Sequence, residues 1–586
     1  MTIDRGVRMV WQTRTPSGAA IDAGGSLVER VLAARGLTGA EAQAFCTPAL
    51  AGLHDPSLIP DLDRAAERIL AAARAGEGVV IYGDYDVDGI TATAILFHML
   101  RAVAPDADVR TYVPHRLEEG YGLNAEAIER LVADGARVIV SVDCGITAIA
   151  PAARAKELGA DLIITDHHNP PASDADLPDA FAVVHPRRPG SPYPFGDLCG
   201  AGVAYKLAWR LATLVCDSDR VTPKLRTLLV ELLALGALGS IADVVPLVDE
   251  NRVITRFGLE RIKGSQIEGL RALVEASGLA DDKIDAMAVG FRLAPRLNAC
   301  GRMGHAAEAV ELFTTASGAR AREIADRLCV LNDERRATER RIADQAMKMA
   351  EDAGMTADDR RAIVLAHPDW HPGVIGIVCS RLVERFHRPV ILLADKGDRV
   401  TGSARSVPGF NLHAAIAACE SYLSSFGGHD MAAGLAADRG NLDAFTEAFT
   451  ERANDAIAPE DLVGRVSYDC DAELGELSLR SVEALEGLAP FGQGNPSVRL
   501  RVRARVTAPG EPFGKMGAHL SLRLRDCSGT GPILRAIGWR WAEHASRVVA
   551  GTDIEAIVVP KVSRWNGRAN VEPELVDLAP ARAATV

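Results

Sequence analysis

The chain has 586 residues, of which 48% are hydrophobic and 24% are charged, and its formal net charge at pH 7 is −13. This balance is typical of a folded, soluble protein and excludes a disordered tail, a collagen-like chain and a coiled-coil rod. There is neither a run of 18 apolar residues nor an apolar signal segment at the start, so we expect no membrane association. The ten cysteines are dispersed without a Cys-x-x-Cys pair, which favours a reducing, cytoplasmic compartment over a zinc module or a disulfide framework.

Short apolar runs alternate with helix-forming segments in the first part of the chain. The runs 79–83, 138–142 and 162–166 each pass directly into an acidic residue or a turn, and 181–185 has the pattern of a further strand. Continuous apolar runs of this length predict parallel strands that are buried on both faces. We therefore expect a doubly wound α/β domain, with helices over 204–240 and 252–275.

The second half of the chain changes pattern twice. Residues 306–355 lack proline and are nearly free of glycine, which predicts a long connecting helix. The apolar runs 362–367 and 389–395 then predict a second α/β domain that ends near residue 457. Apolar and basic residues alternate in 497–506, 518–526 and 533–539, which predicts antiparallel strands with one solvated face.

This last region offsets the acidic whole-chain charge locally. Between Ser497 and Asn570 there are thirteen Lys or Arg residues against five Asp or Glu, an excess of +8. The same region contains three of the six tryptophans: Trp539, Trp541 and Trp565. Basic strands with interspersed aromatic residues favour binding of single-stranded nucleic acid. The alternative is a solvated sheet face with its tryptophans in the core.

Acidic residues and histidines follow the predicted strands of the first domain. The first strand ends in GDYDVDG, the second in VDCG and the third in TDHH, and the later segment LGSIADVVPL adds an aspartate. The residues are Asp84, Asp86, Asp88, Asp143, Asp166, His167, His168 and Asp243. Because the carboxyl ends of neighbouring parallel strands open onto one crevice, we expect these side chains to meet.

Such a group of carboxylates indicates bound cations, because neighbouring negative charges raise one another's pKa. Carboxylates with one or two imidazoles suit Mn²⁺ or Mg²⁺ better than they suit a thiolate-rich zinc site. The excess of carboxylates over the needs of one ion predicts two ions that share a bridging aspartate, as in two-metal phosphoester hydrolysis. A single Asp-x-Asp turn or His pair is more often structural, but here three successive strands end in an acid.

The segments DYDVDG, DCG, DHH and IADVVPL, in this order, resemble the signature of the DHH phosphoesterase superfamily. Further segments resemble the RecJ family of single-stranded-DNA-specific exonucleases: PHRLEEGYGLN, LCGAGVAYKL, APRLNACGRMG, HPGVIGIVCSRL, GSARSVPGFNLHAAI, GGHDMAAGL and PFGQGNP. The resemblance implies an α/β protein with a parallel-sheet DHH domain, a smaller α/β DHHA1 domain and an all-β OB-fold. We place the DHH catalytic domain with an N-terminal extension at 1–320, the connecting helix at 321–355, the DHHA1 domain at 356–457 and the OB-fold at 458–586.

The resemblance also implies an activity. This is 5′-to-3′ hydrolysis of single-stranded DNA with two Mn²⁺ or Mg²⁺ ions, in DNA repair and recombination. The implied partners are single-stranded DNA, a single-stranded-DNA-binding protein and a RecQ-type helicase, and we expect a monomer. A phosphohydrolase for small molecules is a second hypothesis, but it would not need the basic C-terminal module. A third is a DNA-binding scaffold without activity, but it would not need every metal ligand.

Residue by residue, the resemblance makes Asp143, His167 and His168 the catalytic group. Asp143 bridges the two ions, His167 is a ligand, and His168 contacts either a metal or the scissile phosphate. Asp243 completes the shell of the second ion. Of the three aspartates in the first motif (Asp84, Asp86 and Asp88), two bind directly, and Asp86 and Asp88 are preferred.

Three other features of this centre follow from the resemblance and from the loops. Tyr82 stands where relatives can have a histidine, and Asp166 is expected to orient a histidine or to cap the turn. Glycine-rich loops and arginines bind phosphate, and a tyrosine stacks on a base. The implied substrate contacts are Arg116, Tyr121, Asn298, Arg302, Ser403, Arg405, Ser406, Gly427, Gly428 and His429. Gly-rich turns and helix-surface arginines are the alternative interpretations of these loops.

Overall fold

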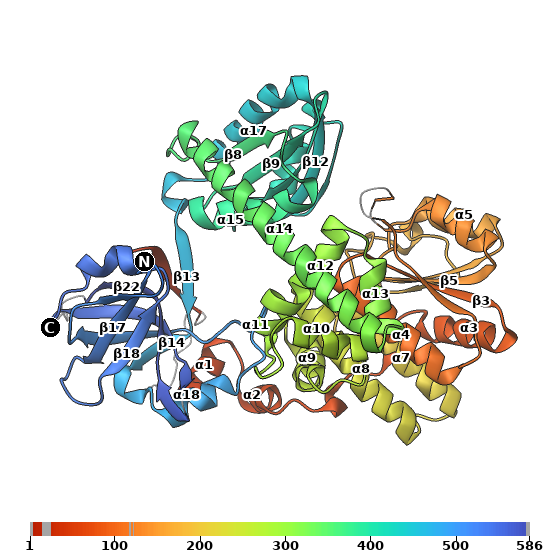
Figure 1. The fold of residues 1–586 in the computed structure, drawn as a ribbon, viewed down its shortest axis with the longest axis horizontal. Coiled ribbons are helices and arrows are strands. Elements are labelled where there is room, and N and C mark those ends of the chain that lie inside the picture. The colour runs from red at the N-terminus through yellow and green to blue at the C-terminus, as the bar shows by residue number, and fades with distance from the viewer. Residues whose placement is uncertain (1–3, 15–24, 116–118, 121, 566, 582–586) are drawn as a thin grey trace. The chain divides into compact units, whose positions relative to one another are not determined.

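The computed structural model describes residues 4–14, 25–115, 119–120, 122–565 and 567–581 (Figure 1). The chain forms two compact units. The central unit consists of Thr47–Arg335 together with Ala489–Pro496. The terminal unit consists of Met1–Cys46, Arg336–Leu488 and Ser497–Val586.

The central unit is built on a five-stranded parallel sheet in the order β4-β3-β5-β6-β7. The strands are β3 (Gly78–Gly83), β4 (Val109–Tyr112), β5 (Ala136–Val142), β6 (Asp161–Thr165) and β7 (Ala182–Val184). All residues of β3 are buried, as expected for a strand covered on both faces. The strand order reverses between β3 and β5, and ligands of open α/β sheets bind at such a switch point.

Helices cover both faces of this sheet. Val79 and Ile81 of β3 belong to the larger core, whereas the alternating Val80 and Tyr82 belong to the smaller core on the other face. The larger core contains α3 (Leu62–Ala75), α4 (Val87–Val103), α7 (Gly200–Cys216), α8 (Pro223–Ala242), α9 (Asp249–Ile262), α10 (Glu268–Ala276), α12 (Ala294–Met303) and α13 (Ala307–Thr314). The smaller core contains α5 (Ala125–Ala133) and α6 (Ile149–Glu157). The doubly wound architecture expected from the sequence is confirmed.

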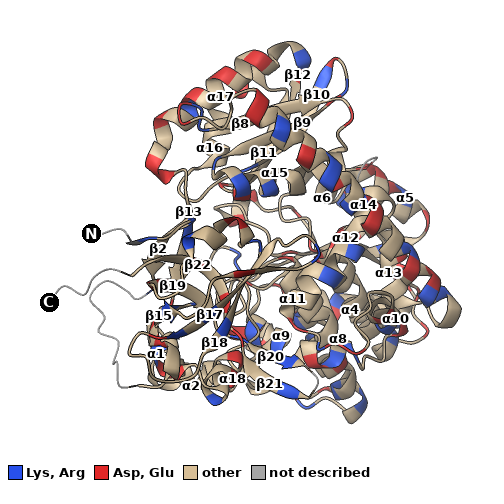
Figure 2. Ribbon diagram, turned by 60° about the vertical axis from the view of Figure 1, so that its left-hand side comes forward, with Lys and Arg blue, Asp and Glu red and all other residues tan. Residues whose placement is uncertain are grey.

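Three expected helices differ from their predicted extents. The helix predicted at 252–275 is two helices, α9 and α10. The predicted helix at 204–240 is α7 and α8, separated by a turn in which Asp217 has a φ of 47°. The long connecting helix is α14 (Gly318–Asp352), along which acidic and basic residues are interspersed (Figure 2). The boundary between the two compact units falls within α14, between Arg335 and Arg336.

One described helix, α8, is long and apolar enough to cross a membrane by length and composition alone. However, 67% of its apolar window is buried inside the protein. Its leucines, including Leu232, Leu233 and Leu235, belong to the larger core of the central unit. The apolar character of α8 is therefore explained by its position in that core.

The first part of the terminal unit is a five-stranded sheet in the order β11-β12-β10-β9-β8. Only β8 and β9 are parallel within it. The strands are β8 (Ile363–His367), β9 (Val390–Asp395), β10 (Arg399–Arg405), β11 (Ser425–Gly428) and β12 (Ala432–Asp438). The accompanying helices are α15 (Pro372–Phe386), α16 (Leu412–Ala417) and α17 (Leu442–Ala456).

The second part is a closed β-barrel. Its strands are β15 (Leu500–Val506), β17 (His519–Asp526), β18 (Leu534–Gly538), β19 (Asp553–Val559) and β22 (Glu574–Pro580). Pairing runs β15-β19-β22-β18-β17 and closes between β17 and β15, with β18 and β22 parallel. This is a five-stranded Greek-key barrel of the OB type. The strands β14 (Cys470–Glu473) and β16 (Glu511–Phe513), the hairpin of β20 (Val562–Trp565) and β21 (Arg568–Val571), and α18 (Leu479–Glu486) complete it.

The start of the chain also belongs to the terminal unit. Strand β2 (Met9–Thr13) pairs with β1 (Asp4–Arg5) and with β13 (Gly464–Tyr468). The indole of Trp11 donates to the buried carboxylate of Asp577 at 2.8 Å. The residues before Thr47, including α1 (Leu27–Ala34) and α2 (Gly39–Cys46), therefore differ from the expected extension of the catalytic domain.

Candidate metal centre

The turn after β3 places two aspartates, Asp86 and Asp88, at the start of α4. The carboxylate of Asp86 caps α4 by accepting from the backbone N–H groups of Asp88 and Gly89, at 2.9 and 3.2 Å. Asp88, which is 1% exposed, accepts from the N–H groups of Gly200 and Ala201 at 2.5 and 2.8 Å. Gly200 and Ala201 are the first two residues of α7. The N-terminus of α7 therefore stabilises the carboxylate of Asp88.

Asp143, at the end of β5, is held in an unusual backbone conformation. Its φ is 62°, in the left-handed region that few residues other than glycine adopt. Its N–H donates to the carbonyl of Thr165 at 3.0 Å. A Cβ on Gly200 would lie 2.6 Å from the Cβ of Asp143, so α7 approaches this closely only because residue 200 is glycine. Strain of this kind persists where the surroundings hold it, and it is common at functional sites.

Asp166 organises the turn that carries the two histidines. It accepts from the N–H of Ile146 at 2.9 Å and contacts Nδ1 of His168 at 2.8 Å. Burial alone would raise the pKa of Asp166, but the hydrogen bond and the charge of His168 lower it to about 2. Burial would lower the pKa of His168, but the hydrogen bond and the charge of Asp166 raise it to about 9. The expected role of Asp166 in orienting a histidine is confirmed.

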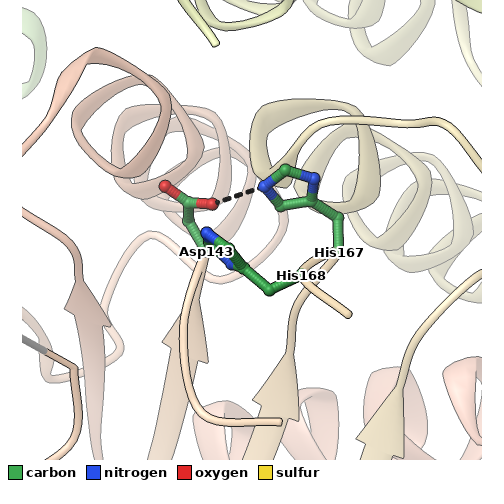
Figure 3. A group of neighbouring side chains, drawn as sticks. All are labelled: Asp143, His167 and His168. Carbon is green, nitrogen blue, oxygen red and sulfur yellow. Dashed lines mark ion pairs between the residues drawn. The ribbon is translucent and has the colours of Figure 1, made fainter. Parts of the chain in front are cut away.

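His167 faces the carboxylates. Its Nε2 lies 3.1 Å from Oδ1 of Asp143, and His168 is beside this pair (Figure 3). The same nitrogen is 3.6 Å from Oδ2 of Asp243 and 3.7 Å from Oδ2 of Asp88. Burial lowers the pKa of His167, which favours the neutral imidazole that a metal ligand requires.

Two residues that the sequence analysis did not identify hold the backbone of this turn. A guanidinium N–H of Arg187 donates to the carbonyl of His167 at 2.6 Å. Nε2 of His185 lies 2.7 Å from the carbonyl of His168. His185 ends the predicted strand 181–185 and Arg187 follows it two residues later, and this position is the only signal in the sequence that could have indicated them.

Among the described residues, the potential ligand atoms form three overlapping groups, in each of which they lie within 4.8 Å of one another. The groups are Asp84, Asp86 and Asp143; Asp88, His167 and Asp243; and Asp143, His167 and His168. Asp143 belongs to the first and third groups, and His167 links the third to the second. The expected convergence of the strand ends is therefore present in the structure.

The electrostatics and the donor set fit divalent cations. Burial and the neighbouring Asp88 raise the pKa of Asp86 and of Asp143, and they raise the pKa of Asp243 to about 8. Apart from their mutual approach, Oδ1 of Asp143 and Nε2 of His167 are buried without a hydrogen bond to any described residue. Carboxylates with a neutral imidazole are suitable ligands for Mn²⁺ or Mg²⁺, and a cation would remove the mutual repulsion.

Several other predicted residues of the central unit have different environments. The hydroxyl of Tyr82 donates to the carbonyl of Gly122 at 3.0 Å, within the smaller core, so Tyr82 does not face the carboxylates. Oδ1 of Asn298 accepts from the N–H of Val87 at 3.2 Å, which places Asn298 as a support for the start of α4. Arg302 is in the last turn of the same helix, α12. The predicted contacts Arg116 and Tyr121 lie outside the described residues.

The predicted phosphate-binding residues of the terminal unit gather around β10 and β11. Ser403 and Arg405 share one face of β10, and a Cβ on Gly376 of α15 would lie 3.3 Å from each. A Cβ on Gly427 would meet nothing within 4 Å, whereas Gly428 has a φ of 143° beside the turn that contains His429. A pocket of about 450 Å³ adjoins them, lined by Arg399, Thr401, Ser425, Phe426, Gly427, Gly434, Leu435 and Ala436.

Ser406 differs from the expectation for this region. Its side chain is 4% exposed, and its hydroxyl donates to the carbonyl of Phe410 at 2.7 Å. The hydroxyl therefore stabilises the turn after β10, and this geometry does not support a contact between Ser406 and a phosphate.

The basic excess of the barrel is smaller than the sequence indicates. Arg501 pairs with Asp471 at 2.7 Å and Arg535 pairs with Glu572 at 2.8 Å, and both acids lie outside the segment 497–570. Trp541 is 1% exposed, beneath the guanidinium of Arg8 at 4.2 Å, so it is a core residue. Trp539 and Trp565 are 51% and 77% exposed. The core alternative is thus correct for one tryptophan of the three.

Comparisons with known proteins agree with this architecture. Residues 78–237 match the model of the DHH family N-terminal domain, 359–455 match the DHHA1 domain and 468–577 match the RecJ OB domain. Together with the acidic centre, these matches define a DHH-class enzyme, a metal-dependent nuclease that hydrolyses phosphodiester bonds.

Relatives that match nearly the whole of this chain identify the family within this class of enzymes. The single-stranded-DNA-specific exonuclease RecJ of Bacillus subtilis (strain 168) is 37% identical, over 94% of this chain and 68% of its own length. A crystal structure of RecJ from Thermus thermophilus in complex with Mn²⁺ matches 95% of this chain and 76% of its own with a TM-score of 0.79 at 31% identity. The corresponding Mg²⁺ complex matches 95% of this chain and 75% of its own with a TM-score of 0.73 at 30% identity. The chain belongs to the RecJ family, and the expected fold class and divalent cofactors are confirmed.

Proposed function

We propose that this protein is an exonuclease that degrades single-stranded DNA from the 5′ end with two divalent ions at the Asp–His centre. The observation that carries the proposal is the overlap of the ligand groups at Asp143 and His167, which lie 3.1 Å apart. When bound, two such ions activate a water molecule and stabilise the leaving oxygen of a phosphodiester. The complete set of ligands argues against a scaffold without activity.

Each residue has a role in this proposal. Asp84 and Asp86 would hold one ion, and Asp88, His167 and Asp243 would hold the other. Asp143, which is grouped with Asp84 and Asp86 and lies 3.1 Å from His167, would bridge the two ions. Asp88 keeps acceptor capacity for an ion, because each of its two carboxylate oxygens can accept along two directions and each accepts from one backbone N–H group. All three aspartates of the first motif are thus proposed as ligands, one more than the two that we expected.

His168 has a different role because of its charge. With a pKa of about 9 it is protonated at neutral pH, and a protonated imidazole is a poor metal ligand. We assign it to the scissile phosphate, where its positive charge binds an anionic oxygen. Asp166 keeps the ring in place through Nδ1.

The terminal unit supplies the contacts that distinguish a DNA strand from a small phosphoester. Ser403, Arg405, Gly427, Gly428 and His429 bind phosphates of the strand, since an arginine fork and open glycine backbone suit phosphate oxygens. Asn298 and Arg302 of α12, with Arg116 and Tyr121, remain further proposed contacts of the central unit.

On the barrel we assign DNA binding to a row of aromatic and basic side chains. Phe513, His519 and Trp539 form an aromatic cluster with ring centroids 4.8–5.9 Å apart. The guanidinium of Arg535 lies 5.6 Å from the ring of Phe513, and Arg523 is its cross-strand partner. Stacked bases on the aromatic cluster and phosphates along the arginines are the usual arrangement for single-stranded nucleic acid. We call Phe513, His519, Trp539, Arg523 and Arg535 the barrel row. In Figure 2, parts of β17 and β18 carry the blue colour of Lys and Arg.

The cellular role follows from the substrate. We propose a cytoplasmic monomer that acts in DNA repair and recombination with a single-stranded-DNA-binding protein and a RecQ-type helicase. All ten cysteines are unpaired, in agreement with a reducing compartment.

The direct test is digestion of 5′- and 3′-labelled single-stranded and duplex DNA with Mn²⁺, Mg²⁺ or EDTA. Release of mononucleotides from the 5′ end of single strands, with either ion and not with EDTA, is the expected result. Release from the 3′ end would refute the direction alone, whereas activity in EDTA would refute the metal-dependent mechanism.

A further inference from the structure

A short segment from the C-terminal half of the chain is part of the central unit. Residues Ala489–Pro496 lie between α18 and β15 in sequence, yet they pack with Thr47–Arg335. The N–H of Gly492 donates to the carbonyl of Asn495 at 2.8 Å, and the buried amide of Asn495 donates to the carbonyl of Pro490 at 2.7 Å. These internal bonds make the segment a formed turn, which we call the 489–496 turn.

The turn contacts the residues that follow Asp243. The N–H of Leu247 donates to the carbonyl of Gln493 at 2.7 Å, and the guanidinium of Arg252 donates to the carbonyl of Ala489 at 3.2 Å. A Cβ on Gly492 would lie 2.7 Å from Cδ1 of Leu247. Because real Cβ contacts are longer than this, a side chain at residue 492 would force the buried Leu247 side chain to shift.

A second glycine of the turn, Gly494, also lies close to the segment that follows Asp243. Gly494 has a φ of 72°, and a Cβ there would lie 3.0 Å from Cβ of Pro246. Both glycines of the Gly-Gln-Gly sequence thus face the same short segment, Pro246–Leu247. The carbonyl between them provides the hydrogen bond to Leu247.

The contacted segment closely follows a proposed metal ligand and a strained residue. Asp243 ends α8, and Val244, which follows it, has a φ of 61°. This conformation is an outlier for a β-branched residue and persists only where the surroundings hold it. Oδ2 of Asp243 lies 3.6 Å from Nε2 of His167, in the group that these residues form with Asp88.

We propose that the 489–496 turn is a positioning element of the metal centre. It fixes Pro246 and Leu247, and through them the strained segment that directs the Asp243 carboxylate toward Asp88 and His167. The inference rests on the proposed two-ion function. It assigns to Gly492 and Gly494 an effect on the affinity for one ion and none on the capture of DNA.

The test compares the full-length chain with Gly492→Ala and with a matched control, Gly475→Ala, where a Cβ meets nothing within 4 Å. Mn²⁺ binding to the metal-free proteins is measured by calorimetry, and the nuclease rate is measured across a Mn²⁺ titration. In Gly492→Ala we expect one dissociation constant for Mn²⁺ to rise about tenfold, together with the half-saturating concentration. The KM for DNA stays within about twofold, and kcat recovers at saturating Mn²⁺. The control behaves like the wild type.

Unchanged Mn²⁺ dissociation constants in Gly492→Ala would overturn the inference, and so would a lost rate that excess Mn²⁺ does not restore. If Gly492→Ala does not fold, Arg252→Lys loosens the bond to Ala489 with the charge retained, and it is expected to shift Mn²⁺ affinity in the same direction. A wild-type chain that binds no Mn²⁺ would instead contradict the proposed function itself.

Discussion

The metal centre of the central unit and the barrel row of the terminal unit differ in how their charges are arranged. At the centre, buried aspartates surround Asp143 with few cations near them, and the pKa of Asp243 is raised to about 8. On the barrel, arginines are exposed or half-exposed, and several are paired with carboxylates, as Arg505 is with Asp553 at 2.7 Å. A buried cluster of like charges must be neutralised by protons or by bound cations, whereas a surface of paired charges needs neither. The centre is therefore the stronger indication of function, and the barrel needs direct tests.

Replacement of the bridging aspartate is the largest test of this contrast. In Asp143→Asn we expect kcat to fall by about a thousandfold or more, because the carboxylate shared by the two ions is lost; this corresponds to ~4 kcal/mol in the barrier. Asparagine tolerates the left-handed backbone, so the fold is retained. The control is Asp217→Asn, at an exposed aspartate with a φ of 47°. Single-turnover kinetics that show more than about a tenth of wild-type activity in Asp143→Asn would exclude a bridging role.

The aromatic part of the barrel row gives the next effect. In the double variant Phe513→Ala, Trp539→Ala we expect the dissociation constant for a single-stranded oligonucleotide to rise, by about 1–3 kcal/mol for each base that loses its stacking partner. The rate at saturating DNA is unchanged, because the ligands of the ions are in the central unit. Fluorescence anisotropy measures the binding, with Trp565→Ala as the control at another exposed tryptophan. Equal weakening in both variants would contradict a specific role for the cluster.

Arg405 tests whether the sheet of the terminal unit also holds the strand. Removal of one charge-assisted contact in Arg405→Ala is expected to raise KM by an amount equivalent to about 1.5–3 kcal/mol, with a smaller change in kcat. In contrast, Ser406→Ala is expected to lower the melting temperature through loss of the hydrogen bond to Phe410, with KM unchanged. Steady-state kinetics and thermal melts of the two variants separate these outcomes, and an unchanged KM in Arg405→Ala would remove this residue from the proposed contacts.

The smallest expected effect is a pH dependence of the metal-free protein. The folded-state pKa of Asp243, about 8, is above its ordinary value, so the folded state binds more protons and its stability falls as pH rises toward 8. His168, with a pKa of about 9, contributes stability at pH 6.5 that is lost as pH rises through 9. The lowered pKa of His167 acts in the opposite direction, but mainly below pH 6.5. In EDTA we therefore expect the melting temperature to fall from pH 6.5 to 9, and saturating Mn²⁺ to reduce that fall. A rising melting temperature in EDTA would contradict these protonation states.

The sequence was sufficient to predict the sheet and most of the centre. The apolar runs before Asp84, Asp143 and Asp166 indicated the strands. Because the carboxyl ends of parallel strands meet at one edge of a sheet, the sequence also predicted that these acids lie close together. The antiparallel strands of the barrel were also indicated by the alternating pattern, whereas the barrel itself was implied by the family resemblance. Its surface charge was predicted less well, because the partner of Arg501 is on a neighbouring strand from outside the basic segment. A local count of charges cannot include partners that arrive through strand pairing.

The residue types and their order thus determined the chemistry of this protein, because ligand identity and strand-end position are local properties of a chain. Tertiary structure decided the supports of that chemistry. Gly200 and Ala201 bind Asp88 across 112 and 113 residues of sequence, and the 489–496 turn reaches Leu247 from the other half of the chain. Tertiary structure also placed Trp541 in the core and Ser406 within its turn. Contacts of this kind depend on which segments lie close together in the folded chain. The spacing of residues along the sequence does not predict them.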